Sequence, residues 1–154
     1  YEGNNGVQAM DLLARKVAGS KGKMMQLFVE DVNDYIAQTN SAEMAPYIGQ
    51  LKEAIDDLND VTKFIVEQSQ QDVEILGAVA NDYLHLFGYT AMAFVWAKMA
   101  QAALTKHSED DHFYDSKVKT ANYYFAKLLP RRFSLIAAIK AGSQSLFDID
   151  EALF

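Results

Sequence analysis

Apolar residues recur along the chain at the three- and four-residue steps of amphipathic helices. The predicted helical segments are residues 5–17, 22–38, 44–65, 72–106 and 114–139. No alternation of apolar and polar residues is long enough to predict a strand, and no internal repeat of 20–50 residues is visible. The sequence therefore predicts an all-α fold, an antiparallel, up-and-down helix bundle with long helices and short loops.

Each long segment carries a stripe of residues that the pattern assigns to the core. The second segment offers Met24, Phe28, Val32 and Tyr35, with Met25, Val29 and Ile36 alongside. The third has a seam of Met44, Ile48, Leu51, Ile55, Leu58, Thr62 and Ile65, while Lys52, Asp56 and Asp60 fall on other faces. The fourth has Val79, Tyr83, Leu86, Thr90, Ala93, Ala97, Ala100 and Leu104. The last has Tyr114, Val118, Ala121, Phe125 and Leu128, followed by Phe133, Ile136 and Ile139.

Local signals place the ends of these helices. Asn40 with Glu43 resembles a capping box before the third segment, and Ser69 with Asp72 is a candidate cap before the fourth. Pro130 removes an amide donor from the last segment, so we expect a kink or an interruption there.

Composition narrows the class of protein. The chain has 154 residues, half of them hydrophobic, which suits one compact core. A formal net charge of −7 disfavours nucleic-acid binding. Residues 84–104 are strongly apolar, but they contain Lys98 and lie between amphipathic neighbours, so we expect a buried bundle helix and no membrane span. The absence of cysteine suits a reducing compartment, and we expect a cytoplasmic protein.

Candidate metal and catalytic residues are few. Asp82 with His85, and Glu109 with His112, have the acid–x–x–His spacing of carboxylate-bridged metal bundles, but the seam of the third segment lacks the inward glutamates that such a site needs. Lys98 is expected to extend its amine to water rather than to act in catalysis. We expect the aromatic run Tyr123, Tyr124 and Phe125 to fill the core and its grooves.

The opening residues, YEGNNGVQAMDL, carry a resemblance to a known family. Tyr1-Glu2-Gly3, followed by a polar residue, a short loop and a helix, resembles the tail of the flavin-dependent acyl-CoA dehydrogenases. The continuation from Gly6 is similar to a long bacterial branch that carries an extra C-terminal helical domain. Residues 81–100 and 113–150 also resemble that domain, so the likeness covers nearly the whole chain.

The resemblance implies roles for the first six residues. Glu2 would be the catalytic base that abstracts the α-proton of an acyl-CoA thioester, while the β-hydrogen leaves as hydride to FAD. Tyr1 and Gly3 would contact the substrate. Asn4, Asn5 and Gly6 would lie in a loop that touches FAD, although Asn4 replaces the usual Thr and Gly6 the Gln of several relatives.

The same resemblance predicts how the chain is divided. Residues 1–21 would be the tail of the catalytic domain, and residues 22–154 the C-terminal helical bundle domain. A first residue of Tyr leads us to expect a processed or truncated chain, catalytically inactive alone and without bound FAD. The parent enzyme would use an acyl-CoA and an electron acceptor and would form a homo-oligomer. Two alternatives remain open: a non-catalytic helical interaction or oligomerisation module, and a metal-binding bundle.

Overall fold

The computed structural model describes residues 4–106, 112–148 and 151–153. These residues form helices almost throughout and contain no strand, which confirms the all-α prediction. The helical elements in chain order are α1 (Asn5–Met10), η1 (Asp11–Ala18), α2 (Lys23–Gln38), α3 (Ala45–Gln68), α4 (Glu74–Thr105), α5 (His112–Tyr123), η2 (Tyr124–Leu128), η3 (Leu129–Arg131), α6 (Arg132–Lys140), α7 (Gln144–Phe147) and η4 (Glu151–Leu153).

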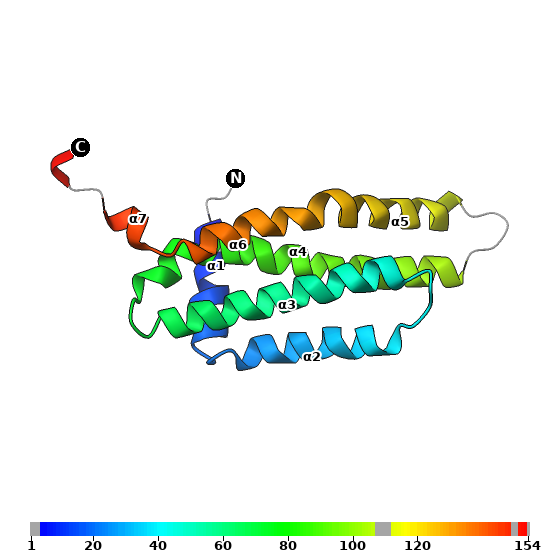
Figure 1. Cartoon of the computed structure of the whole chain (residues 1–154), viewed down its shortest axis with the longest axis horizontal. Helices are drawn as coiled ribbons and strands as arrows, with labels where there is room; N and C mark the ends of the chain where they lie inside the picture. Colours follow the sequence, from blue (N-terminus) through cyan, green and yellow to red (C-terminus); the bar gives the residue numbers. More distant parts are fainter. Residues whose placement is uncertain (1–3, 107–111, 149–150, 154) are drawn as a thin grey trace.

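Four long arms run antiparallel to one another, as predicted for an up-and-down bundle (Figure 1). They are α2, α3, α4 and the arm that runs from α5 through η2 and η3 into α6. Helix α4 is the central element, because it packs against α3, α5, α6 and the N-terminal helix. The N-terminal helix, α1 with η1, runs across the long arms rather than along them (Figure 1). No helix in the described ranges combines the length and the apolar character needed to cross a lipid bilayer.

The α3 seam is the best-predicted part of the core. All of its predicted residues are buried except Ile48, which is half-buried, and Lys52, Asp56 and Asp60 are exposed as expected. On α4 the predicted stripe is likewise buried except for Leu104, which is half-buried. Between these two seams the hydroxyl groups of Thr62 and Tyr83 lie 2.8 Å apart, so the core contains a satisfied polar contact.

Pro130 interrupts the last arm as predicted. A π-helical turn, η2, and a 3₁₀ turn, η3, replace regular α-helix immediately around it. The first turn of a helix tolerates proline because its amide donors have no intrahelical partner. Beyond the interruption the arm continues as α6, which packs against both α3 and α4.

Some expectations for individual residues are wrong. Met24 is exposed and Met25 is buried, so the buried stripe of α2 is Met25, Val29 and Val32. Phe133 is 56% exposed because the neighbouring Arg132 occupies the buried position. The Asn40–Glu43 capping box does not form, since α3 begins later, at Ala45, and the Asn40 amide donates to the Ala37 carbonyl at the end of α2.

Candidate functional site

Three of the six predicted site residues lie within the described part of the chain. Asn4, Asn5 and Gly6 are exposed at the start of α1, where Asn4 occupies the N-cap position and its carbonyl accepts from the Gln8 amide at 3.0 Å. Gly6 has open space around the position that a Cβ would take. Tyr1, Glu2 and Gly3 lie outside the described residues.

The N-terminal helix fixes where this segment starts. Ala9, Leu13 and Val17 are buried in the same core as α3 and α4. After η1 the chain turns through Lys21 and Gly22, which both have positive φ, before α2 begins. The segment 4–6 therefore begins a helix that is anchored in the bundle by three apolar side chains.

An ion pair lies on the outer side of this helix. The Asp11 carboxylate accepts hydrogen bonds from the Arg15 guanidinium, one of them 2.9 Å long, and Lys16 approaches to 3.3 Å. The hydrogen-bonded Arg15 lowers the pKa of Asp11 to about 2, with Lys16 adding to the effect. Because Arg15 is exposed and Asp11 is only half-buried, solvent screens the pair and it adds little to the stability of the fold.

The candidate metal ligands do not assemble in the described structure. Asp82 is half-buried and His85 is exposed on α4, and Glu109 lies outside the described residues. Among the described residues, no group of three or more His, Asp and Glu side chains could hold a metal ion. The acid–x–x–His spacings thus find no partners on neighbouring described helices.

The other candidates have structural roles. Lys98 is exposed, and its Nζ lies 4.9 Å from the centre of the Phe94 ring, so the amine extends to solvent over an aromatic surface. Tyr124 and Phe125 are buried as expected, but Tyr123 is exposed. The Tyr124 hydroxyl donates to the Tyr89 carbonyl at 2.7 Å, and burial raises its pKa.

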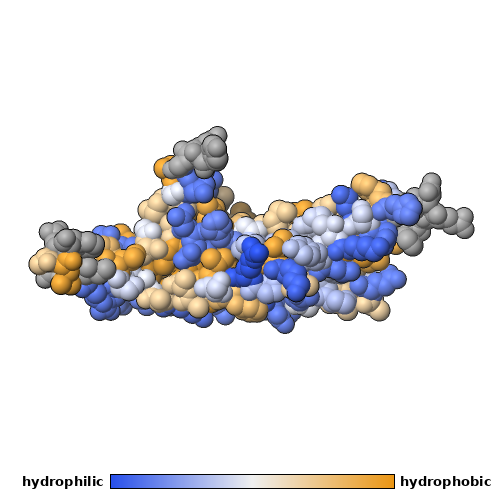
Figure 2. All heavy atoms as spheres, turned by 90° about the horizontal axis from the view of Figure 1, so that it is seen from above, coloured by the Kyte–Doolittle hydropathy of each residue, from blue (hydrophilic) through white to orange (hydrophobic). Residues whose placement is uncertain are grey.

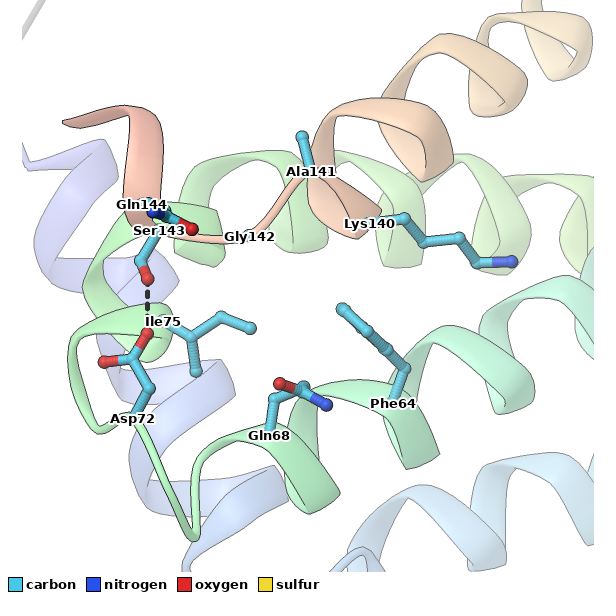
Figure 3. Close-up of a pocket in the computed structure, with 9 residues that line it drawn as sticks. All are labelled: Phe64, Gln68, Asp72, Ile75, Lys140, Ala141, Gly142, Ser143 and Gln144. Atoms are coloured by element: carbon cyan, nitrogen blue, oxygen red, sulfur yellow. Dashed lines mark hydrogen bonds between the residues drawn. The ribbon is translucent and has the colours of Figure 1, made fainter. Parts of the chain in front are cut away.

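A cavity of about 310 Å³ lies where the ends of α3 and α6 meet the start of α4 (Figure 3). Ser143 donates to one Asp72 carboxylate oxygen, drawn as a dashed line, and the other accepts from the Glu74 amide at 3.0 Å. Asp72 therefore accepts from the first amide of α4 and ties the chain after α6 to the start of that helix. No histidine among the described residues lines this cavity, so within that part of the chain Ser143 and Asp72 do not form a Ser–His–acid arrangement.

A buried arginine, Arg132, was not predicted from the hydrophobic pattern. Arg132 is almost completely buried, and its guanidinium donates to Asp57 at 2.9 Å and to Glu53 at 3.2 Å, which ties α6 to α3. Its spacing from the buried Leu129 and Ile139 is that of one helix face, so the position could have been found. The hydrophobicity of the adjacent Phe133 concealed it.

Comparison with known proteins identifies the family of this helical fold. A family model described as "Acetyl-CoA dehydrogenase C-terminal like" matches residues 28–150. The chain therefore belongs to this acyl-CoA dehydrogenase C-terminal family.

Curated relatives carry dehydrogenase names. A butyryl-CoA dehydrogenase of Syntrophomonas wolfei is 25% identical over 160 residues, covering all of this chain and 26% of the relative. A second butyryl-CoA dehydrogenase of that organism is 22% identical over 157 residues, covering 98% of this chain and 26% of the relative. A broad-specificity linear acyl-CoA dehydrogenase of Mycobacterium tuberculosis is 24% identical over 166 residues, covering all of this chain and 27% of the relative. The chain thus spans about a quarter of the length of the curated relatives it matches.

Proposed function

We propose that this chain is the C-terminal part of a flavin-dependent acyl-CoA dehydrogenase that forms an α,β double bond in an acyl-CoA thioester, as in fatty-acid β-oxidation. The observation that carries the proposal is the family match over residues 28–150, together with the dehydrogenase names of the relatives. The YEG sequence at residues 1–3 supports it independently, because that stretch precedes the region matched by the family model.

In the proposed reaction, the carboxylate of Glu2 takes the α-proton of the bound thioester. FAD, when bound, would supply the acceptor for the β-hydrogen, which would leave as hydride. Asn4 and Asn5 have exposed side chains and Gly6 leaves open space beside its backbone, so these residues fit the edge of a flavin site. Tyr1 and Gly3 would contact the acyl-CoA. The described bundle supplies no further residue for the chemistry, so the isolated chain should neither bind FAD stoichiometrically nor turn over acyl-CoA.

The experiment that tests this proposal is anaerobic flavin reduction in the full-length parent. Glu2→Gln keeps the side-chain shape but removes the proton acceptor, so the variant should retain bound FAD while acyl-CoA no longer bleaches it. General-base catalysis typically contributes ~10²–10⁴-fold, so a rate loss of at least that size is expected. Glu43→Gln, an exposed acid before α3, is the matched control. Bleaching of the Glu2→Gln variant at the wild-type rate would assign the base to another residue.

The remaining features of the proposal concern the whole enzyme. An electron acceptor must reoxidise the flavin, and a homo-oligomer is expected for the parent, which sedimentation would test. The cytoplasmic location stays a prediction that cell fractionation would check. The interaction-module alternative predicts a gene product without a flavoprotein region upstream of residue 1, so the upstream sequence separates it from the dehydrogenase proposal.

A further inference from the structure

Helix α4 exposes a line of residues that carries no formal charge. Its successive exposed positions fall at steps of three or four residues, and we name the following set the uncharged line: Gly77, Asn81, His85, Gly88, Met92 and Val95. The exposed positions that bracket it are Glu74 and Lys98. Met92 and Val95 are 46% and 44% exposed, so the line has an apolar part as well as small residues.

The other faces of α4 are covered by neighbouring helices. Tyr83 contacts Thr62 on α3. Phe94 stacks edge-to-face with Tyr35 on α2 at 5.4 Å, and Trp96 stacks with Tyr124 of η2 at 6.4 Å. A helix that is apolar all round is normally covered all round. The uncharged line is the side of α4 that the described residues leave to solvent.

Other arms differ in what they expose. The exposed face of α3 carries Lys52, Glu53, Asp56, Asp60, Lys63 and Glu67. On α2 the exposed apolar side chains Met24 and Leu27 lie among Lys23, Glu30, Asp31 and Asp34. Charged side chains keep those faces hydrated, whereas the uncharged line lacks them over most of the length of α4.

The N-terminal helix places the start of the chain beside α4. Helix α1 packs on α4, and Val7 and Met10 on α1 are exposed. The α1 segment stands out from the body of the bundle in the view of Figure 2. In the proposed parent, the chain before residue 1 enters the bundle through this helix.

A pocket beside the uncharged line adds a polar element. It has a volume of about 290 Å³ and is lined by His85 and Tyr89 of α4, by Arg131, and by Ser134 and Leu135 of α6. Arg131 makes no salt bridge with a described residue, whereas Arg15 and Arg132 both pair with carboxylates. No carboxylate of the described residues lines the pocket, so a group docked here could present one to Arg131.

We propose that the uncharged line of α4 is the surface on which the catalytic part of the same parent polypeptide docks. The docked surface has an apolar centre opposite Met92 and Val95 and a carboxylate or carbonyl oxygen opposite Arg131. This inference rests on the proposed function, because it takes the occupant to be the dehydrogenase region that precedes residue 1. Docking on α4 would hold the catalytic region and the bundle together at a second point besides their covalent joint at α1.

Thiol labelling tests the docking directly, because the chain contains no cysteine. Val95→Cys reports on the uncharged line, and Asp60→Cys, at an exposed position of α3, is the control. Both variants are made in the full-length parent and in the isolated chain. Maleimide labelling is followed by mass spectrometry of peptides from this chain, so upstream cysteines do not interfere. Thermal melts verify that both variants stay folded.

We expect both cysteines to react at similar rates in the isolated chain, and Cys at position 95 to react at least tenfold more slowly than Cys at position 60 in the parent. Equal rates in the parent would overturn the inference. Protection of position 95 in the isolated chain that grows with protein concentration would also overturn it, in favour of a second copy. Labelling needs no turnover, so the two proposals can fail separately. If acyl-CoA bleaches the flavin of the parent but position 95 reacts freely, this inference alone is refuted. If position 95 is protected but acyl-CoA does not bleach the flavin, the proposed function alone is refuted.

Discussion

The hydrogen bond between Thr62 and Tyr83 allows a directional prediction about the core. The Thr62 hydroxyl donates its proton to the Leu58 carbonyl at 2.7 Å. The 2.8 Å contact with Tyr83 must then have the Tyr83 hydroxyl as donor and the Thr62 oxygen as acceptor. Removing one partner therefore has different effects on the other. Tyr83→Phe leaves an acceptor unused, whereas Thr62→Val leaves a buried O–H donor without a partner.

These effects differ in size. A neutral hydrogen bond contributes about 1 kcal/mol, so Tyr83→Phe should lower the free energy of unfolding by roughly that amount. Thr62→Val should cost more, about 1–3 kcal/mol, because the stranded hydroxyl of Tyr83 is fully buried. In the double variant neither group is stranded, so its cost should fall below the sum of the two single costs by roughly 1 kcal/mol.

Urea denaturation at neutral pH, followed by circular dichroism at 222 nm, measures these costs. The four proteins of the cycle should share one dependence of unfolding free energy on urea, which shows that the folded and unfolded states are comparable. Single costs that add to the double cost within about 0.3 kcal/mol would show that the two hydroxyl groups are not coupled. A larger cost for Tyr83→Phe than for Thr62→Val would refute the assigned donor and acceptor.

Further predictions concern packing and alkaline pH. Leu58→Ala should lower the unfolding free energy by about 2–5 kcal/mol because Leu58 is fully buried. Lys52→Ala, on the exposed face of α3, should lower it by less than about 0.5 kcal/mol. Equal urea midpoints for the two variants would contradict the α3 seam. Burial raises the pKa of Tyr83 from 10.0 to about 12, so its contribution to stability is complete below pH 10 and is lost as pH rises toward 12. Tyr83→Phe should therefore lose less unfolding free energy than the wild type between pH 9 and 11, and equal losses in urea titrations would contradict this.

The α3 seam could be predicted because its residues alternate cleanly with charges. Only one face of this helix is apolar, so one burial pattern is possible. Helix α2 has overlapping apolar stripes, and the positions of the neighbouring helices determine which stripe is buried. Met25 rather than Met24 is buried for that reason. On α6, Arg132 takes the buried position, where its guanidinium has two carboxylate partners. A prediction from hydrophobicity alone buries the adjacent Phe133 instead.

The candidate site was predicted by resemblance rather than by physical pattern. Nothing in the periodicity marks Glu2 as a base, and its predicted role needs groups that lie beyond this chain. The hydrogen bond from Ser143 to Asp72 could not be predicted from the sequence for a different reason. It joins residues far apart in sequence, and a serine after a helix end carries no local signal of its partner.

The π-helical stretch η1 sets how the start of the N-terminal helix is rotated about the helix axis relative to the bundle. The Gly19 amide donates to the Ala14 carbonyl at 2.8 Å, five residues back, so this stretch holds one residue more than an α-helical turn would. A side chain at position 19 would collide with the Arg15 carbonyl, which makes glycine necessary there. Each residue turns an α-helix by about 100°. Deleting one residue from η1 would therefore swing Asn4–Gly6 around the helix axis by about that angle while Val17 stays in the core. The number of residues in η1 therefore sets the direction that Asn4–Gly6 face around the helix axis.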